Sequence, residues 1–118
     1  MKIWLDDLRP PPDVTWYWAK TSQDALSNLM SYGSECTHIS LDHDLGNLDD
    51  RDGCGHDVLA YLEEASASGG YWFRHYLRVH SANPVASARM RATIDSIHRM
   101  WAKAEGCSVE DLPERTWK

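Results

Sequence analysis

The sequence has 118 residues, of which 42% are hydrophobic and 25% charged, and its acidic residues exceed its basic ones to give a formal net charge of -6. This length and composition predict one folded domain and exclude a disordered or collagen-like protein. The acidic balance argues against extended nucleic-acid binding, which depends on lysine and arginine contacts to phosphates. We expect a single domain over 1–118, with a core at about 1–104 and a polar tail at 105–118.

The sequence shows neither a targeting signal nor a membrane span. Charged residues follow Met1 almost at once, and no apolar run approaches the length that a bilayer requires. The three cysteines, Cys36, Cys54 and Cys107, are odd in number and lack the paired spacing of a zinc ribbon. We therefore expect a reduced, cytoplasmic protein that makes no contact with a membrane.

Strand and helix signals alternate along the chain, which is typical of an open, mostly parallel sheet with covering helices. The first half predicts, in order, a strand at 2–5, a proline-rich turn at 8–12, a strand at 15–19 and a helix that begins at Thr21-Ser22 and ends at Gly33. Leu26, Leu29 and Met30 have the spacing of an apolar helix face. Trp16 and Trp18 share one face of the second strand, and we expect both in the core.

The second half continues this alternation. It predicts a strand at 38–41, an Asp- and Gly-rich loop between Gly46 and Gly55, a helix that resumes near Asp57, a strand at 76–79 and a final long helix. Asn83 and Pro84 suit the N-cap and first position of that helix, whose apolar face would be Met90, Ile94, Ile97 and Trp101. The elements predict an α/β three-layer sandwich with a mostly parallel sheet of about four strands.

Three of the predicted strands end in polar residues that can support chemistry, namely Asp6-Asp7, Asp42-His43-Asp44 and His80-Ser81. The carboxyl ends of parallel strands meet at one edge of a sheet, where α/β proteins bind their ligands. Two carboxylates about 5 Å apart repel by roughly 3 kcal/mol at an effective dielectric near 20, so one must be protonated or a cation must lie among them. Asp6, Asp7 and Asp42 therefore predict a Mg²⁺ or Mn²⁺ site, because all-oxygen ligands suit these ions better than zinc.

Several of these residues have more than one interpretation. An aspartate at a strand end also bonds nearby backbone N–H groups without any ligand. Arg9 would either clamp a phosphate, aimed by the proline run that follows it, or only neutralise the adjacent acids. His43 and His80 flank the acidic residues and are candidates for proton transfer, while Asp44 and His56 are additional candidates for the site. Ordinary surface or half-buried positions are expected for His38, His75 and His98.

These segments resemble the receiver-domain superfamily of two-component signalling over residues 1 to about 100. Asp6-Asp7 is similar to the receiver's metal-binding acids and Asp42 to its phosphoacceptor, while Gly55 to Leu59 resembles its following helix start and Val79 to Ala82 the end of its fourth strand. The receiver's fifth strand, which ends in lysine, has no predicted counterpart. The combination of LDDLRPPP, SLDHDLG and VHSANP more closely resembles the divergent cyclic-phosphate processing receiver domain family.

The resemblance implies a reduced flavodoxin- or receiver-like fold and a divalent-metal-dependent phosphoesterase that processes a cyclic phosphate on a nucleotide or RNA end. Its partner would be a small phosphorylated or cyclic-phosphate ligand, and the pattern assigns no protein partner. The site would combine catalytic His80, His43 and Ser81 with a phosphate cradle of Arg9, Ser81 and Asn83 at the start of the last helix. The alternative is a non-catalytic signalling or binding module with Asp42 as phosphoacceptor, which the missing lysine disfavours.

Overall fold

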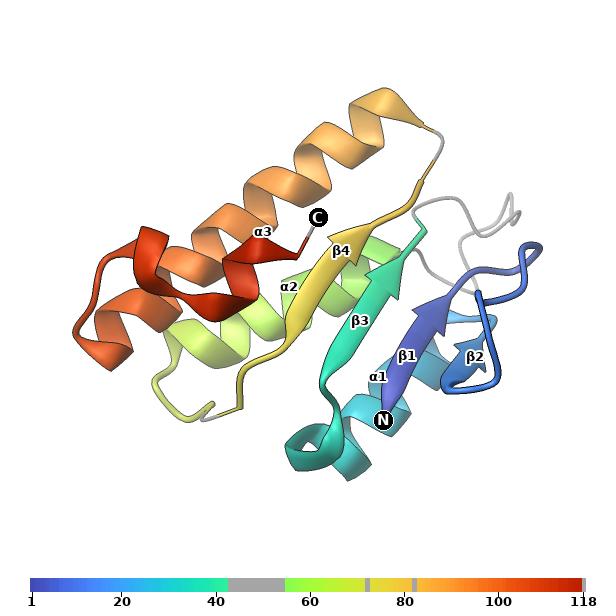
Figure 1. Cartoon of the computed structure of the whole chain (residues 1–118), viewed down its shortest axis with the longest axis horizontal. Coiled ribbons are helices and arrows are strands. Elements are labelled where there is room, and N and C mark those ends of the chain that lie inside the picture. Colours follow the sequence, from blue (N-terminus) through green and yellow to red (C-terminus); the bar gives the residue numbers. More distant parts are fainter. Residues whose placement is uncertain (43–54, 72, 82, 118) are drawn as a thin grey trace.

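The computed structural model describes residues 1–42, 55–71, 73–81 and 83–117. Its four strands are all parallel and lie in the order β2-β1-β3-β4, with β1 at Lys2–Leu5, β2 at Trp16–Ala19, β3 at His38–Leu41 and β4 at Tyr76–Val79 (Figure 1). This receiver-like α/β sheet confirms the predicted fold class. Thr15 stands just outside β2, because its N–H and hydroxyl both donate to the Asp13 side chain in a local turn. The predicted loop from Gly46 lies almost entirely outside the described residues.

Three α-helices follow the strands: α1 at Ser22–Tyr32, α2 at Gly55–Ala67 and α3 at Pro84–Glu105. The predicted caps account for their starts, since Thr21 accepts the N–H of Asp24 at α1 and Asn83 accepts the N–H of Ala86 at α3. α3 ends at Gly106, whose φ of 72° is left-handed and favours glycine. Among the described residues, no helix is long and apolar enough to cross a membrane.

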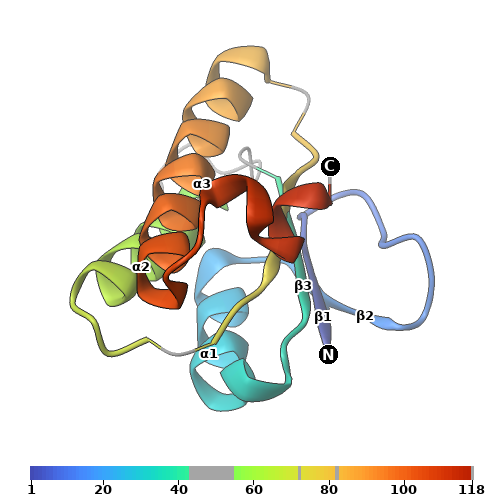
Figure 2. The same cartoon turned by 60° about the vertical axis from the view of Figure 1, so that its left-hand side comes forward.

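The two faces of the sheet differ in composition. One face is aliphatic and packs against α1 and α2, which lie on the same side of the sheet in Figure 2, and its buried residues are Ile3, Leu5, Ala19, Ile39, Leu41, Leu77 and Val79. Alternation along the strands puts a different set on the opposite face, here called the aromatic face: Lys2, Trp4, Trp16, Trp18, His38, Ser40, Tyr76 and Arg78. Trp16 and Trp18 are only half-buried there, so their expected core position was wrong, whereas Trp101 is a core residue as expected.

The buried residues of α1 and α3 can be compared with the apolar faces that the sequence predicts for these two helices. In α1 the buried positions are Ser22, Ala25 and Leu29, and Met30 is 60% exposed. The expectation that Met30 belongs to the apolar face was therefore wrong, because the buried face of α1 runs through Ser22, Ala25 and Leu29 and leaves Met30 on the exposed side. The predicted apolar face of α3 is confirmed, since Met90, Ile94, Ile97 and Trp101 are all buried.

The C-terminal residues pack against the sheet through two short 3-10 turns, at Val109–Asp111 and Pro113–Thr116. Leu112, between these turns, is buried in the core. Trp117 lies on the aromatic face, where its ring centroid is 6.2 Å from that of Trp16 and 5.0 Å from that of His38. This segment therefore forms a third layer against the aromatic face.

Replacement of Leu112 by alanine is expected to lower the free energy of unfolding by about 2–5 kcal/mol, the usual cost of truncating a buried leucine. Leu8 is the matched control, because its side chain is 79% exposed and Leu8→Ala should change stability by about 0.5 kcal/mol or less. Urea unfolding of the two variants measures the difference. Equal stabilities would contradict a contribution of the C-terminal segment to the core.

Candidate active site

The register of the sheet aligns three of the predicted site residues. Asp6, Asp42 and His80 stand one residue beyond the paired ends of β1, β3 and β4. The backbone ladder continues into them, since the N–H of Asp42 donates to the carbonyl of Leu5 at 2.9 Å and that of His80 to Leu41 at 2.9 Å. In the strand order β2-β1-β3-β4, β2 lies on one side of β1 and β3 lies on the other. The order of the strands therefore reverses next to β1, and open α/β sheets bind ligands at such a switch point. The three residues thus form one row at the ligand-binding edge.

The two carboxylates of this row, Asp6 and Asp42, lie close to a third, that of Asp7. One oxygen from each of Asp6, Asp7 and Asp42 lies within 4.8 Å of the other two. Asp6 and Asp42 are buried, and Asp7 is half-buried. We call this group the acidic cluster. Because its three carboxylates are close together and largely buried, they repel one another when ionised, and a positive charge is needed to relieve this repulsion.

Arg9 supplies one positive charge to the acidic cluster. Its Nε donates to Asp6 Oδ2 at 3.2 Å, its Nη2 lies 3.8 Å from Asp42 Oδ2, and the same nitrogen donates to the carbonyl of His80 at 3.1 Å. These contacts fit the neutralising role considered for Arg9, and its role as a phosphate clamp stays a prediction. The Arg9 side chain is nevertheless 54% exposed, so solvent and ligands can reach it.

Asp6 is held in its ionised form by its surroundings. The backbone N–H groups of Leu8 and Arg9 both donate to its Oδ1 at 2.9 Å. Burial acts to raise the pKa of Asp6, but these two N–H groups, the bond from His80 and the charge of Arg9 outweigh it and hold that pKa below its ordinary value. Asp6 therefore offers a carboxylate rather than a carboxylic acid.

His80 is fixed between two polar partners. Its Nε2 lies 3.1 Å from Asp6 Oδ2, its Nδ1 lies 2.7 Å from Ser40 Oγ, and its ring stacks on Trp4 at 3.9 Å between centroids with 6° between planes. Burial lowers the pKa of His80 more than the adjacent carboxylate raises it. With a neutral ring and an ionised Asp6, the network assigns the proton to Nε2, which donates to Asp6, while Nδ1 accepts from Ser40.

Three residues that support this site were not predicted from the sequence. Ser40 orients His80, as described above, and two indoles hold the turn that carries Asp6. The Trp18 Nε1–H donates to the carbonyl of Asp6 at 2.6 Å, and the Trp4 Nε1–H donates to the carbonyl of Arg9 at 2.9 Å. The available signal was alternation, because Trp4 and Ser40 precede Asp6 and Asp42 by two residues and share their face of the sheet.

The remaining predicted residues lie elsewhere in the hydrogen-bond network. Ser81 Oγ accepts the N–H of Asn83 at 3.2 Å, and Asn83 in turn caps α3. Within the described part of the chain, neither side chain bonds to the acidic cluster. His56 is paired with Thr93 Oγ1 of α3 at 3.0 Å. Two further predicted residues, His43 and Asp44, lie outside the described residues.

The sequence of residues 1–96 matches the cyclic-phosphate processing receiver domain family. The chain belongs to this family. The match covers the whole sheet, the acidic cluster and His80, and it assigns the protein a role in cyclic-phosphate processing. No curated protein and no solved structure matches the chain significantly.

Gly55 explains how this receiver domain positions Asp42. A Cβ atom at Gly55 would lie 2.0 Å from the carbonyl oxygen of Asp42 and 3.0 Å from Cε of Met90. Real Cβ atoms do not approach backbone so closely, so only glycine allows α2 to begin against the end of β3. The start of α2 therefore lies against the backbone of Asp42, which contributes one of the three carboxylates.

Two histidines outside the row are more buried than expected. His75 is 0% exposed, with Nδ1 lying 2.7 Å from the carbonyl of Cys36 and Nε2 bonded to the Tyr71 hydroxyl. His98 is also buried, on the face of α3 that packs inward. The expectation of surface or half-buried positions was wrong for both. Their burial depends on tertiary packing, which the residues next to them in the sequence do not reveal.

The stability of the receiver domain is expected to fall as the pH drops from 7 to 5. Burial lowers the pKa of His75, His80 and His98 below 6.5, so the unfolded chain takes up protons at a higher pH than the folded protein does. Each proton taken up only by the unfolded state costs up to about 1.4 kcal/mol of stability per pH unit. Urea unfolding at pH 7, 6 and 5 measures the slope. A stability that stays constant or rises would contradict the burial of neutral histidines.

Proposed function

We propose that this receiver domain opens cyclic phosphates with the help of a Mg²⁺ or Mn²⁺ ion held by Asp6, Asp7 and Asp42. The observation that carries the proposal is the meeting of three carboxylate oxygens within 4.8 Å, beside His80, in a member of the cyclic-phosphate processing family. The substrate would be a nucleotide or an RNA end with a cyclic phosphate. The acidic surface of the protein fits a ligand with one phosphate group better than a long polyanion.

The residues of the acidic cluster fit a small, hard cation. All three donors are carboxylate oxygens, which Mg²⁺ and Mn²⁺ prefer, and neither a thiol nor an imidazole is among them. Arg9 contributes one positive charge against three carboxylates, so a divalent ion would improve the balance. When bound, such an ion neutralises phosphate oxygens and makes the phosphorus easier to attack.

His80 is the group that we assign to proton transfer. Ring opening joins a water oxygen to phosphorus, breaks the bond from phosphorus to one ribose oxygen, and leaves one water proton on that oxygen. The Ser40 hydroxyl can accept from Nδ1 as well as donate to it, so a cation that shields Asp6 would allow the His80 proton to move to Nδ1. Nε2, which lies against the acidic cluster, would then be free to take this proton from water and hand it to the ribose oxygen. The second proton-transfer group predicted from the sequence, His43, lies outside the described residues.

A phosphate at the acidic cluster would also find donors beside it. Arg9 is more than half exposed and could turn from the carboxylates toward phosphate oxygens once a cation relieves their repulsion. Ser81 and Asn83 lie between His80 and the first residue of α3, Pro84, where the positive end of the helix dipole favours anions. We assign these three residues to phosphate binding.

The test is turnover of 2′,3′-cyclic AMP by the purified protein with Mg²⁺, with Mn²⁺ and with EDTA, followed by chromatography of the monophosphate product. We expect metal-dependent ring opening. Calorimetric titration with Mn²⁺ should show binding that Asp42→Asn weakens by at least about tenfold and that the exposed control Asp13→Asn leaves unchanged. If the ring stays closed while acetyl phosphate adds a stable phosphate to Asp42, as read by intact mass, the signalling alternative replaces this proposal.

A further inference from the structure

The aromatic face of the sheet is partly open to solvent at β1 and β2. The helix that packs on these two strands is α1, which covers their opposite face, while the C-terminal 3-10 turn packs against β4 at the far side of the sheet (Figure 2). Four of the six tryptophans of the chain belong to the aromatic face, and all of them are only half-buried: Trp4, Trp16, Trp18 and Trp117. A contiguous exposed patch of such large side chains is typical of a binding surface.

Two lysines lie over the tryptophan rings of β2. The Lys2 ammonium stands 4.9 Å from the ring centroid of Trp16, and the Lys20 ammonium stands 4.6 Å from that of Trp18. Lys20 is exposed, so the face of the ring below it is covered by a flexible, solvated chain rather than by packed protein. Stacking of a nucleobase on a ring is worth more than an exposed cation–π contact. A base can therefore displace each lysine, and the freed ammonium stays beside it.

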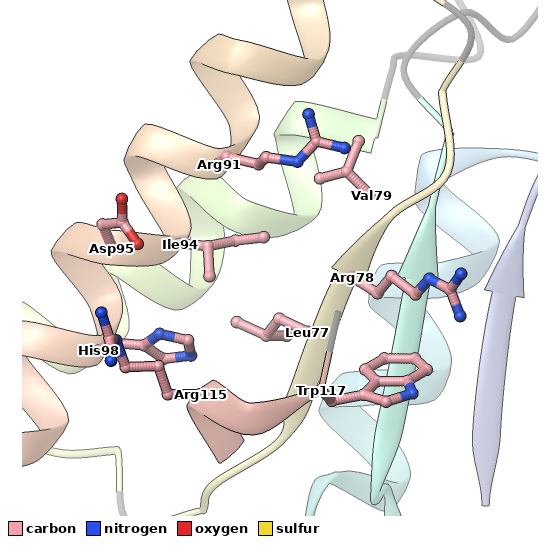
Figure 3. Close-up of a pocket in the computed structure, with 9 residues that line it drawn as sticks. All are labelled: Leu77, Arg78, Val79, Arg91, Ile94, Asp95, His98, Arg115 and Trp117. Carbon is pink, nitrogen blue, oxygen red and sulfur yellow. The ribbon is translucent and has the colours of Figure 1, made fainter. Parts of the chain in front are cut away.

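The charge of the aromatic face favours an anionic strand. None of its residues is acidic, and within the described residues neither Lys20 nor Arg78 forms a salt bridge. The Arg78 guanidinium lies 5.6 Å from the ring of Trp117, and Figure 3 shows the two together over β3. Lys2 interacts with Asp13, whose pKa is lowered chiefly by hydrogen bonds within its own turn and to a smaller extent by the Lys2 charge. This face is thus positive in a protein whose net charge is -6.

The aromatic face leads directly to the acidic cluster. The indole of Trp18 bonds the carbonyl of Asp6 at 2.6 Å, and the ring of Trp4 stacks on His80. Trp16 precedes Trp18 by two residues on β2, a step of about 6.6 Å along a strand, which one extended nucleotide can span. Stacking surfaces and cations therefore follow one another along β2 up to the proposed site of chemistry.

We propose that the aromatic face binds the last two nucleotides of a single-stranded RNA whose cyclic phosphate lies at the acidic cluster. The terminal base stacks on Trp18 and the base before it on Trp16, while Lys20 and Lys2 pair with phosphates of the strand. This inference rests on the proposed function and narrows its substrate to an RNA end, because a 2′,3′-cyclic phosphate needs the 2′-hydroxyl that distinguishes RNA from DNA. So short a contact is compatible with an acidic protein.

Binding is measured with hexa-adenylate RNA that carries a 5′ fluorescent label and a 3′-hydroxyl, titrated in EDTA and followed by anisotropy. Trp16→Leu should weaken binding by about 5- to 150-fold, which is the loss of one stacked base. Tyr32→Leu is the matched control, because Tyr32 is an exposed aromatic residue of α1 outside the aromatic face, and it should bind as the wild type does. Equal affinities of the two variants would overturn the assignment of Trp16 to base stacking.

The salt dependence of the same titration tests the lysines without disturbing the rings. Each phosphate contact to a single strand contributes about 0.7 to the slope of log affinity against log salt concentration, so K2Q/K20Q should lower that slope by about 1.4. The matched control R89Q/R99Q removes two exposed cations of α3 and should leave slope and affinity within about twofold of the wild type. Equal losses of slope in both double variants would show general attraction by charge and overturn the proposed surface.

Turnover separates this inference from the proposed function. An oligoadenylate that ends in a 2′,3′-cyclic phosphate should be opened with a kcat/KM at least about fivefold above that of 2′,3′-cyclic AMP, and Trp16→Leu should remove only this advantage. Hexa-adenylate binding that Trp16→Leu weakens, with no ring opening, would contradict the proposed function and leave the RNA-binding surface standing. Ring opening of 2′,3′-cyclic AMP with no preference for the oligonucleotide and no hexa-adenylate binding would overturn this inference alone. In that case, self-association lost in Trp16→Leu would assign the face to a second copy of the chain.

Discussion

His80→Gln is expected to slow the opening of 2′,3′-cyclic AMP by about 10²- to 10⁴-fold, the usual contribution of a positioned general acid or base. Glutamine keeps an N–H donor of similar reach toward Asp6, so the carboxylate keeps its hydrogen bond while the titrating ring is lost. The affinity for Mn²⁺ should therefore stay within a few-fold of the wild type. Steady-state turnover and calorimetry on the same preparation measure the two effects.

His38→Gln is the control for that experiment. His38 lies on the same aromatic face, at the opposite end of β3 from Asp42, and no contact joins it to the acidic cluster within the described residues. Its turnover should match the wild type. A His80→Gln protein that keeps full turnover but binds Mn²⁺ poorly would assign His80 to positioning Asp6 alone and remove it from proton transfer.

Gly55→Ala is expected to lower the free energy of unfolding by at least about 1–3 kcal/mol, the usual cost of overpacking. The added methyl group would have to displace backbone, because the carbonyl oxygen of Asp42 lies 2.0 Å from its position. Displacing that carbonyl shifts the whole residue, so Mn²⁺ binding should weaken together with stability. Urea unfolding and calorimetry test the two consequences separately.

Gly70→Ala is the matched control, because its nearest neighbour, the Ser68 hydroxyl, lies 3.9 Å from the added carbon and its φ is not left-handed. Alanine there should leave stability unchanged or slightly higher, since it restricts the unfolded chain. If Gly55→Ala were as stable as Gly70→Ala and bound Mn²⁺ normally, α2 would not constrain Asp42 in the way that we describe.

The sequence predicted the strands well because each is a short apolar run that ends in polar residues. It also predicted that Asp6, Asp42 and His80 would come together, since the ends of parallel strands share one edge. The helix starts were equally accessible, because Thr21 and Asn83 act locally on the turn that follows them. These features depend on residues a few positions apart or on a general property of parallel sheets.

The features that the sequence did not reveal depend on long-range packing. The bond between Ser40 and His80 joins residues 40 positions apart and requires the pairing of β3 with β4. Alternation shows that Trp16 and Trp18 share a face, but not that α1 and α2 cover the other one. Met30 was misplaced for a similar reason, because the rotation of α1 is set by its contacts with the strands rather than by its own periodicity.

The two indole N–H groups that hold the turn at Asp6 and Arg9 give the protein a built-in optical probe. Trp18 and Trp4 bond the carbonyls of Asp6 and Arg9, and the ring of Trp4 also lies flat on His80. Any shift of that turn when an ion or ligand arrives changes the surroundings of these two chromophores. Ultraviolet emission and near-ultraviolet dichroism can therefore report occupancy of the site without an added label.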